Sequence, residues 1–129
     1  MSIEKDLVAV IEKYRMHPQF IGMDITDVNQ RGVMDDTMLH FAAVLGATED
    51  IDVLVASGVD VNAVGDIGNT PLLNAAMRGK AAAVKKLLEL GADPELKNEL
   101  GWSAAEVAKN LGRDEVVEVL RTFQVRRAP

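Results

Sequence analysis

The chain has 129 residues, of which 48% are hydrophobic and only 4% aromatic, and it contains no cysteine. This length suits one domain whose core is packed by Leu, Val and Ala, a composition better suited to thin stacked helices than to a sheet sandwich. The lack of cysteine excludes disulfides and Cys-based metal sites, and the formal net charge of −6 argues against a nucleic-acid backbone as the partner.

The first expected element is a helix over residues 2–15, which Ser2 is suited to cap. Charged residues interrupt its apolar ones, so the segment is neither a signal peptide nor a membrane span, and we expect a cytoplasmic protein with no membrane partner. Pro18 then breaks the helix, and we expect Phe20 and Ile21 to seal the open end of the core. The apolar positions at helical spacing are Ile3, Leu7, Val10 and Ile11.

From residue 27 onward the sequence repeats itself. Asp27-Val28-Asn29 recurs 33 positions later as Asp60-Val61-Asn62. The strongest unit follows Asn69, with the sequence Thr-Pro-Leu-Leu, whereas the last unit, around Trp102, is degenerate. A fixed period of this length is typical of a repeat architecture in which each unit buries its apolar face against its neighbours. The same step relates Gly46, Gly79 and Gly112, and also Thr37, Thr70 and Ser103.

These residues at these offsets resemble the ankyrin repeat. The resemblance implies an all-α solenoid of stacked helix pairs with hairpin-like finger loops, capped at both ends. We expect a single domain over 1–129, in which the capping half-repeat has a weak second helix. Its expected parts are an N-terminal capping half-repeat (1–29), repeats at 30–62 and 63–95, a C-terminal capping repeat (96–124) and a tail (125–129).

Several residues of the strongest unit have a clear physical role. Thr70 is suited to cap a helix through its hydroxyl, and Pro71 then occupies the first helical position, where no N–H is missed. The small pair Ala75-Ala76 lets neighbouring helix pairs approach closely. Gly79 is expected to reverse the chain between the two helices, and Gly91 to end the second in a left-handed conformation.

The sequence offers no constellation of catalytic residues. It has two histidines, and His40 falls at the histidine position of the Thr-Pro-Leu-His motif, where the resemblance implies a tie between neighbouring loops. His17 precedes a proline and is expected to be solvated, and the adjacent Asp35 and Asp36 suit a loop surface better than acid–base chemistry. Because no phosphate loop, metal-ligand cluster or nucleophile elbow is present, we expect a non-enzymatic protein without cofactor or metal.

The resemblance implies that a partner protein lies along the finger tips and the outer side of the first helices. Apolar residues occupy positions there that the solenoid itself does not need, and acidic residues border them, as in protein-binding surfaces. Trp102 and Met77 are the expected anchors, the first large and the second adaptable. The predicted partner-binding residues are Met34, Asp35, Asp36, Val44, Asp66, Ile67, Asn69, Met77, Arg78, Glu99, Leu100 and Trp102.

An alternative for part of this surface is that Val33, Trp102 and Leu111 fold back to cover the edge of the solenoid. Between residues 30 and 69 one basic residue stands against seven acidic ones, which favours a basic partner, although plain solubility explains the charge equally well.

Two functions remain open besides the disfavoured enzyme. One is a monomeric binder of a single protein, and the other is a structural adaptor that associates with itself. For the binder, the layout of one helix, a proline turn and the segment from Asp27 to Gly32 is similar to small stand-alone bacterial ankyrin proteins. Several of these are immunity proteins that neutralise a toxin, and a basic toxin would suit the acidic middle.

Overall fold

The computed structural model describes residues 3–25 and 27–127 and is all-helical over that part of the chain, as predicted. Ser2, the expected cap of the first helix, lies outside the described residues. The helices, in chain order, are α1 (Ile3–Tyr14), α2 (Met38–Leu45), α3 (Thr48–Ala56), the short 3₁₀ turn η1 (Asp66–Gly68), α4 (Pro71–Met77), α5 (Ala81–Glu89), α6 (Ala104–Asn110) and α7 (Asp114–Arg127).

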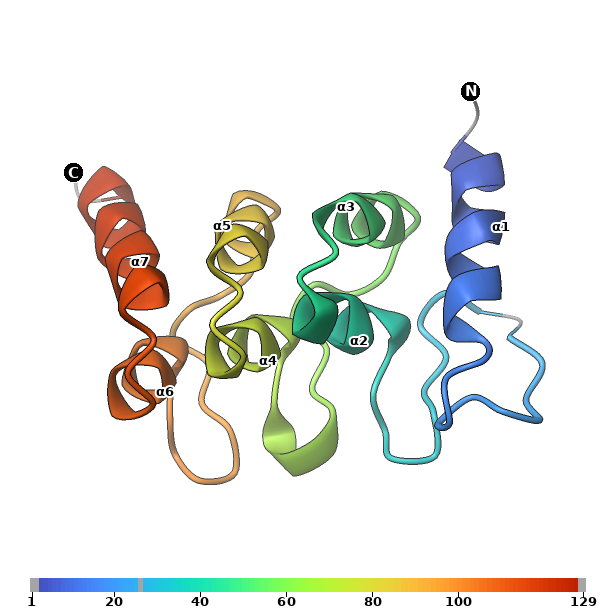
Figure 1. Cartoon of the computed structure of the whole chain (residues 1–129), viewed down its shortest axis with the longest axis horizontal. Helices are drawn as coiled ribbons and strands as arrows, with labels where there is room; N and C mark the ends of the chain where they lie inside the picture. The colour runs from blue at the N-terminus through green and yellow to red at the C-terminus, as the bar shows by residue number, and fades with distance from the viewer. Residues whose placement is uncertain (1–2, 26, 128–129) are drawn as a thin grey trace.

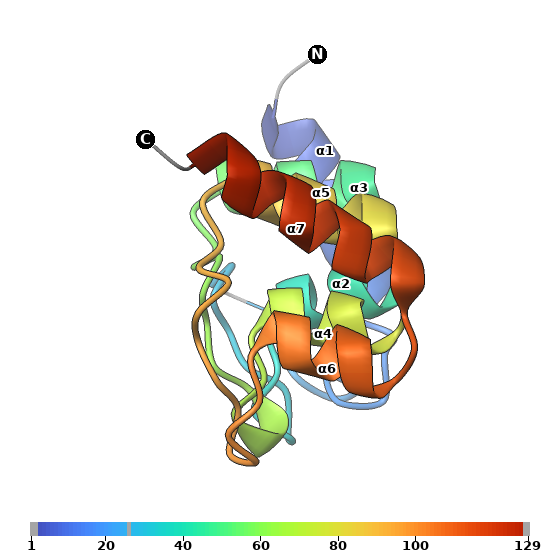
Figure 2. The same cartoon turned by 90° about the vertical axis from the view of Figure 1, so that its left-hand side faces the viewer.

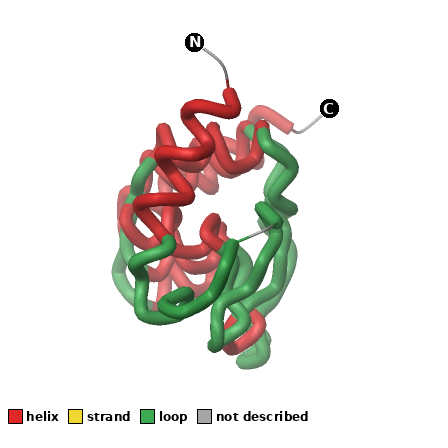
Figure 3. The backbone as a smooth tube through the Cα atoms, turned by 90° about the vertical axis from the view of Figure 1, so that its right-hand side faces the viewer, coloured by secondary structure: helices red, strands yellow, loops and turns green. Residues whose placement is uncertain are grey.

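The helices form two layers, and the finger loops project from one edge (Figures 1 and 2). Helices α2, α4 and α6 pack side by side in one layer, and α3, α5 and α7 pack in the other. Each α2–α3, α4–α5 and α6–α7 pair is also in contact, so the stack is a solenoid of helix pairs. Figure 3 shows the long loops on the right of the helical layers and beneath them, with short turns on the left.

Local sequence determines where the first helix of each pair begins. The hydroxyl of Thr70 accepts a hydrogen bond from the backbone N–H of Leu73 at 3.2 Å, and Pro71 follows as the first helical residue, so both predicted roles are confirmed. Ser103 and Glu106 form a reciprocal capping box at the start of α6. These contacts satisfy backbone N–H groups that the first turn of a helix leaves free.

The turn from the first to the second helix depends on glycine. Gly46, Gly79 and Gly112 have φ of 71°, 69° and 69° respectively. This left-handed conformation strains any residue with a Cβ, which explains why glycine recurs at this point in all three units.

The interface between helix pairs is built on small and aliphatic residues. Leu72 and Leu87, from the two helices of the central unit, are 1% and 0% exposed, and burial of each contributes about 1.5–3 kcal/mol. Because the alanines occupy little volume, neighbouring helices approach closely, as predicted. The fully buried alanines include Ala42, Ala43, Ala75, Ala76 and Ala108.

The Asp-Val-Asn segments link consecutive repeats. The side chain of Asn29 accepts a hydrogen bond from the backbone N–H of Asp60 at 2.9 Å and donates one to the carbonyl of Gly58 at 3.1 Å. One repeat later, Asn62 accepts from the N–H of Asp93 at 2.9 Å. This contact spans one repeat each time, so the recurrence of asparagine 33 positions apart has a direct structural cause.

The N-terminal segment departs from the repeat. Helix α1 packs mainly against α3, in the layer of second helices, and residues 15–22 form turns where a weak second helix was expected. Phe20 is fully buried, as predicted, and its ring meets that of Phe41 in a T-shaped contact with 5.7 Å between centroids. The prediction that Ile21 also seals the core is wrong, because the turn directs only Phe20 inward and leaves Ile21 61% exposed.

Candidate functional site

The three finger tips are closed by the same backbone hydrogen bond. In the first, the N–H of Gly32 donates to the carbonyl of Asp36 at 2.8 Å, and in the second that of Gly65 donates to Asn69 at 2.8 Å. The third tip closes with a bond from Asn98 to Trp102 at 3.0 Å. The tips therefore present equivalent residues in a row along one edge of the stack (Figure 1).

Predicted apolar residues at these tips are exposed. Met34 is 54%, Ile67 50% and Leu100 65% exposed, and the acidic Asp35 and Glu99 beside them are exposed as well. The alternative in which Val33 and Leu111 fold back over the edge of the solenoid is not observed, because these side chains are 72% and 44% exposed.

A groove of about 360 Å³ opens between the first two finger units, next to α2 and α4. It brings together half of the predicted site and adds four residues that the sequence reasoning missed. The predicted residues in its lining are Asp36, Val44, Asp66, Asn69, Met77 and Arg78, and the added ones are His17, Gln19, Phe41 and Asn74.

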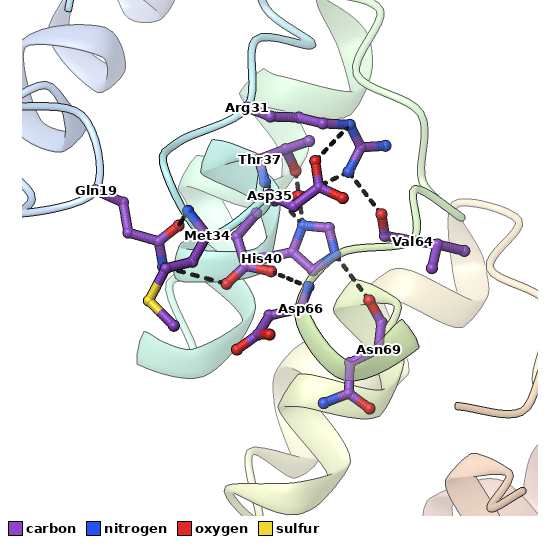
Figure 4. A network of polar contacts seen from close by, with 10 residues as sticks. Gln19, Arg31, Met34, Asp35, Thr37, His40, Val64, Asp66 and Asn69 are labelled. Carbon is purple, nitrogen blue, oxygen red and sulfur yellow. Dashed lines mark hydrogen bonds and ion pairs between the residues drawn. The ribbon is translucent and has the colours of Figure 1, made fainter. Parts of the chain in front are cut away.

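Asp36 holds one end of this groove together. Its carboxylate accepts a hydrogen bond from the backbone N–H of Asp66 at 2.9 Å and another from the side-chain amide of Gln19 at 3.3 Å. The amide oxygen of Gln19 in turn accepts from the N–H of Met34 at 3.1 Å (Figure 4). Asp36 thus links the N-terminal turn to the first two fingers, and both its oxygens already have partners within the chain.

His40 lies beneath the same fingers and is fully buried. The backbone N–H of Thr37 donates to His40 Nδ1 at 3.0 Å, so the proton is on Nε2, which donates to the carbonyl of Asn69 at 2.9 Å. This confirms the predicted tie between neighbouring loops (Figure 4). Burial lowers the pKa of His40, an effect that the nearby carboxylate of Asp36 opposes.

Three polar side chains in the groove have no partner within the described residues. Asp66 is half-buried, yet none of those residues donates a hydrogen bond to its carboxylate, which turns away from His40 in Figure 4. The amide of Asn74 and the guanidinium of Arg78 are likewise without a hydrogen bond or ion pair to that part of the chain. These groups are free to contact another molecule.

Two predicted contact residues are less accessible than expected. Asn69 is only 7% exposed, because its side-chain oxygen accepts from Asn98 at 3.1 Å and its amide contacts the sulfur of Met77 at 3.6 Å. Trp102 is half-buried and packs against the hydrophobic core, which agrees with the fold-back alternative for this residue and makes it less accessible than the expected anchor. Asn98 accepts from the backbone N–H of Trp102 at 3.1 Å, and this bond holds the third finger in that conformation.

The residues that the sequence reasoning missed divide into two kinds. Asn74 lies three positions before Met77 on α4, and this helical spacing places both on one face, so the signal was present. His17 was expected to be solvated, but its ring lies 3.9 Å from that of Phe41 between centroids, and its Nδ1 accepts from the N–H of Gln19 at 3.2 Å. The repeat pattern could not identify His17 or Gln19, because both residues precede the repeats.

The described residues contain no group of three or more potential metal-ligating side chains, and no helix among them is long and apolar enough to cross a membrane. A second hollow of about 280 Å³ lies between α5 and α7, lined in part by Leu88, Val119 and Phe123. It contains none of the predicted binding residues.

A sequence model described as "Ankyrin repeats (3 copies)" matches residues 39–126, so the chain belongs to the ankyrin-repeat family. It is similar to the inactive serine/threonine-protein kinase TEX14 of Bos taurus, with 34% identity over 103 residues, which is 80% of this chain and 7% of that protein. It is also similar to protein phosphatase 1 regulatory subunit 12A of Mus musculus, with 42% identity over 72 residues, or 56% of this chain and 7% of that protein.

A third relative, the palmitoyltransferase Hip14 of Drosophila melanogaster, is 35% identical over 82 residues, or 63% of this chain and 13% of that protein. The chain thus spans only a small part of the length of these curated relatives. Ankyrin repeats are a general protein–protein interaction module, and the likeness is to that module within each larger protein.

Proposed function

We propose that this domain is a non-enzymatic binding module whose partner protein contacts the finger tips and the groove beside α2 and α4. The observation that carries the proposal is the continuity of these two features, since Met34 and Ile67 lie at the tips of the same two fingers whose bases border the groove. Exposed apolar side chains beside a hollow with unpaired polar groups are typical of protein-binding surfaces.

The proposed contact set is narrower than the sequence-based expectation. Leu100, which is among the predicted residues, remains the apolar contact of the third finger, whereas Trp102 is left out because it packs against the core. Asn69 and Asp36 shape the groove from within the chain, whereas Asp66, Met77 and Arg78 line it and are available to a partner.

A random-peptide phage library panned on the immobilised protein tests this function. We expect wild-type protein to enrich peptides that lose at least about tenfold in affinity for the triple variant M34A/I67A/L100A, because each alanine removes an exposed apolar contact. Thermal unfolding of this variant should stay close to that of wild type, since the replaced side chains are exposed.

The matched control is V8A/V117A/V125A, which removes exposed apolar side chains from α1 and α7, away from the finger tips (Figure 1). It should bind the selected peptides like wild type. Equal loss in both triple variants, or no enrichment above an unrelated control protein, would contradict the proposed surface.

Two finer hypotheses have less support. The toxin-immunity role has no support beyond the likeness in layout, and the relatives named above are animal proteins whose names mention no toxin. Self-association through the exposed tips predicts a concentration-dependent dimer in light scattering, whereas the proposed module is a monomer. A cytoplasmic location stays part of the proposal, and the cysteine-free composition is compatible with it.

A further inference from the structure

We propose that the groove selects a partner segment of mixed charge, with a basic side chain directed at Asp66, a carboxylate directed at Arg78 and an apolar side chain between them. This inference rests on the proposed function and specifies the chemistry of the partner. The two charged groups line the same groove, together with apolar residues.

Asp66 has the environment of an anion that lacks a counterion. Its side chain is half-buried in the groove wall, so it has lost part of its hydration, and none of the described residues pairs with its carboxylate. Its neighbour Asp36 is different, because the oxygens of Asp36 already accept from the N–H of Asp66 and from Gln19. A lysine or arginine of a partner would therefore pair with Asp66.

Arg78 provides the opposite charge. It follows the last residue of α4 and is exposed, and its guanidinium makes no hydrogen bond or ion pair with the described residues. By contrast, Arg113 donates to the carbonyl of Met77 at 2.9 Å and Arg121 is paired with Glu118. An unpaired guanidinium in a groove presents a planar set of donors that suits a carboxylate.

The rest of the lining is suited to a peptide. Phe41, Val44 and Met77 supply apolar surface, and the flexible methionine adapts to side chains of different shape. The free amide of Asn74 offers both a donor and an acceptor, which an extended peptide backbone requires. Opposite charges with apolar surface in one groove give a partner a preferred orientation and disfavour a segment of uniform charge.

The experiment uses peptides that the phage library yields on the wild-type protein. We expect them to contain a lysine or arginine and an aspartate or glutamate, with an apolar residue between. Replacing the basic residue of such a peptide by glutamine should weaken its binding to wild type about tenfold but leave its binding to D66N unchanged. Replacing the acidic residue should likewise weaken binding to wild type but leave binding to R78Q unchanged. This is a double-mutant cycle for each predicted ion pair.

The variants E115Q and K109Q make the same changes of charge at exposed positions of α7 and α6 and serve as matched controls. They should retain the full effect of both peptide substitutions. Thermal unfolding of D66N and R78Q establishes that both variants fold.

Three outcomes overturn the inference. The inference is refuted if the peptides lack either charge, or if the cycles show no coupling with Asp66 and Arg78. The proposed function still stands in both cases if binding of those peptides depends on Met34, Ile67 and Leu100. A library that yields no specific peptide refutes both.

Discussion

At the scale of single residues, Ile67 stands out because it combines two unfavourable properties. Its φ of 59° places a β-branched residue in the left-handed region, and its apolar side chain is half exposed at the tip of the second finger. The equivalent residues Met34 and Leu100 are not in this conformation. A side chain kept at such a position is well explained by a contact with a partner.

The variant I67N should therefore stabilise the isolated domain while weakening binding of the selected peptides. Asparagine tolerates the left-handed conformation, which costs other L-residues about 1–2 kcal/mol, so we expect the free energy of unfolding to rise by about 1 kcal/mol. Urea denaturation measures this change. The control L100N removes a similar exposed side chain from ordinary backbone and should bring no such gain, and a loss of stability in I67N would contradict the account.

His40 makes the stability of the protein depend on pH. Burial lowers its pKa in the folded state, so the unfolded chain binds the proton more readily, and acid favours unfolding. The neutral imidazole of His40 contributes its full stabilisation above the unfolded pKa of about 6.5. As pH falls from there towards the lowered folded pKa, the free energy of unfolding decreases by no more than about 1.4 kcal/mol per pH unit.

Denaturant unfolding of wild type and H40Q between pH 7 and 5 tests this prediction. The slope of stability against pH should be smaller in H40Q, even if that variant is less stable throughout, because it has no imidazole at this position to titrate. Equal slopes in H40Q and wild type would show that His40 is not the responsible group.

At the scale of elements, α1 is anchored through one carboxylate of α3. The hydroxyl of Tyr14 donates to Asp50 at 2.8 Å, and the ammonium of Lys13 lies 2.7 Å from the same oxygen. Burial, together with this carboxylate, raises the pKa of Tyr14, so the phenol remains a donor at ordinary pH.

The variant D50A should loosen α1 and destabilise the domain by about 1–3 kcal/mol, because it leaves a largely buried tyrosine hydroxyl without its acceptor. Amide hydrogen exchange should accelerate across α1 more than across α4 and α5. The variant D52A, on the same helix, breaks an ion pair with Lys86 that is partly open to solvent and should change stability by less than about 1 kcal/mol. Similar effects of the two substitutions would argue against Asp50 as a specific anchor.

The elements also show how far the sequence predicts this fold. The period of 33 residues correctly predicted the helix pairs after residue 37, because Thr70, Pro71 and Gly79 occupy positions with local structural requirements. The position of α1 was not predictable in the same way. Its packing against α3 depends on tertiary contacts such as that of Tyr14 with Asp50, and this segment departs from the repeat.

At the scale of the whole molecule, the fingers are linked from one to the next. His40 connects the first finger to Asn69 in the second, and Asn69 accepts a hydrogen bond from Asn98 in the third. The N–H of Glu99 also donates to the carbonyl of Ile67 at 3.0 Å. Because these contacts form a continuous chain, the finger row presents one ordered surface to a partner.

The parts of the candidate site that follow the repeat were predictable from the sequence. Equivalent positions in successive units indicated the exposed tips Met34, Ile67 and Leu100 and the helix residue Met77. The spacing of residues along the sequence did not reveal the hydrogen-bond partners that bury Asn69. The inward packing of Trp102 likewise depends on the conformation of the third finger.

The most direct measurement of the central claim is an NMR titration of the ¹⁵N-labelled protein with a peptide selected on it. The account predicts that amide signals shift at the finger tips and along the groove, around Ile67, Asp66, Met77 and Arg78. Shifts confined to the hollow between α5 and α7, at Leu88, Val119 and Phe123, would place the partner on the opposite layer and contradict it.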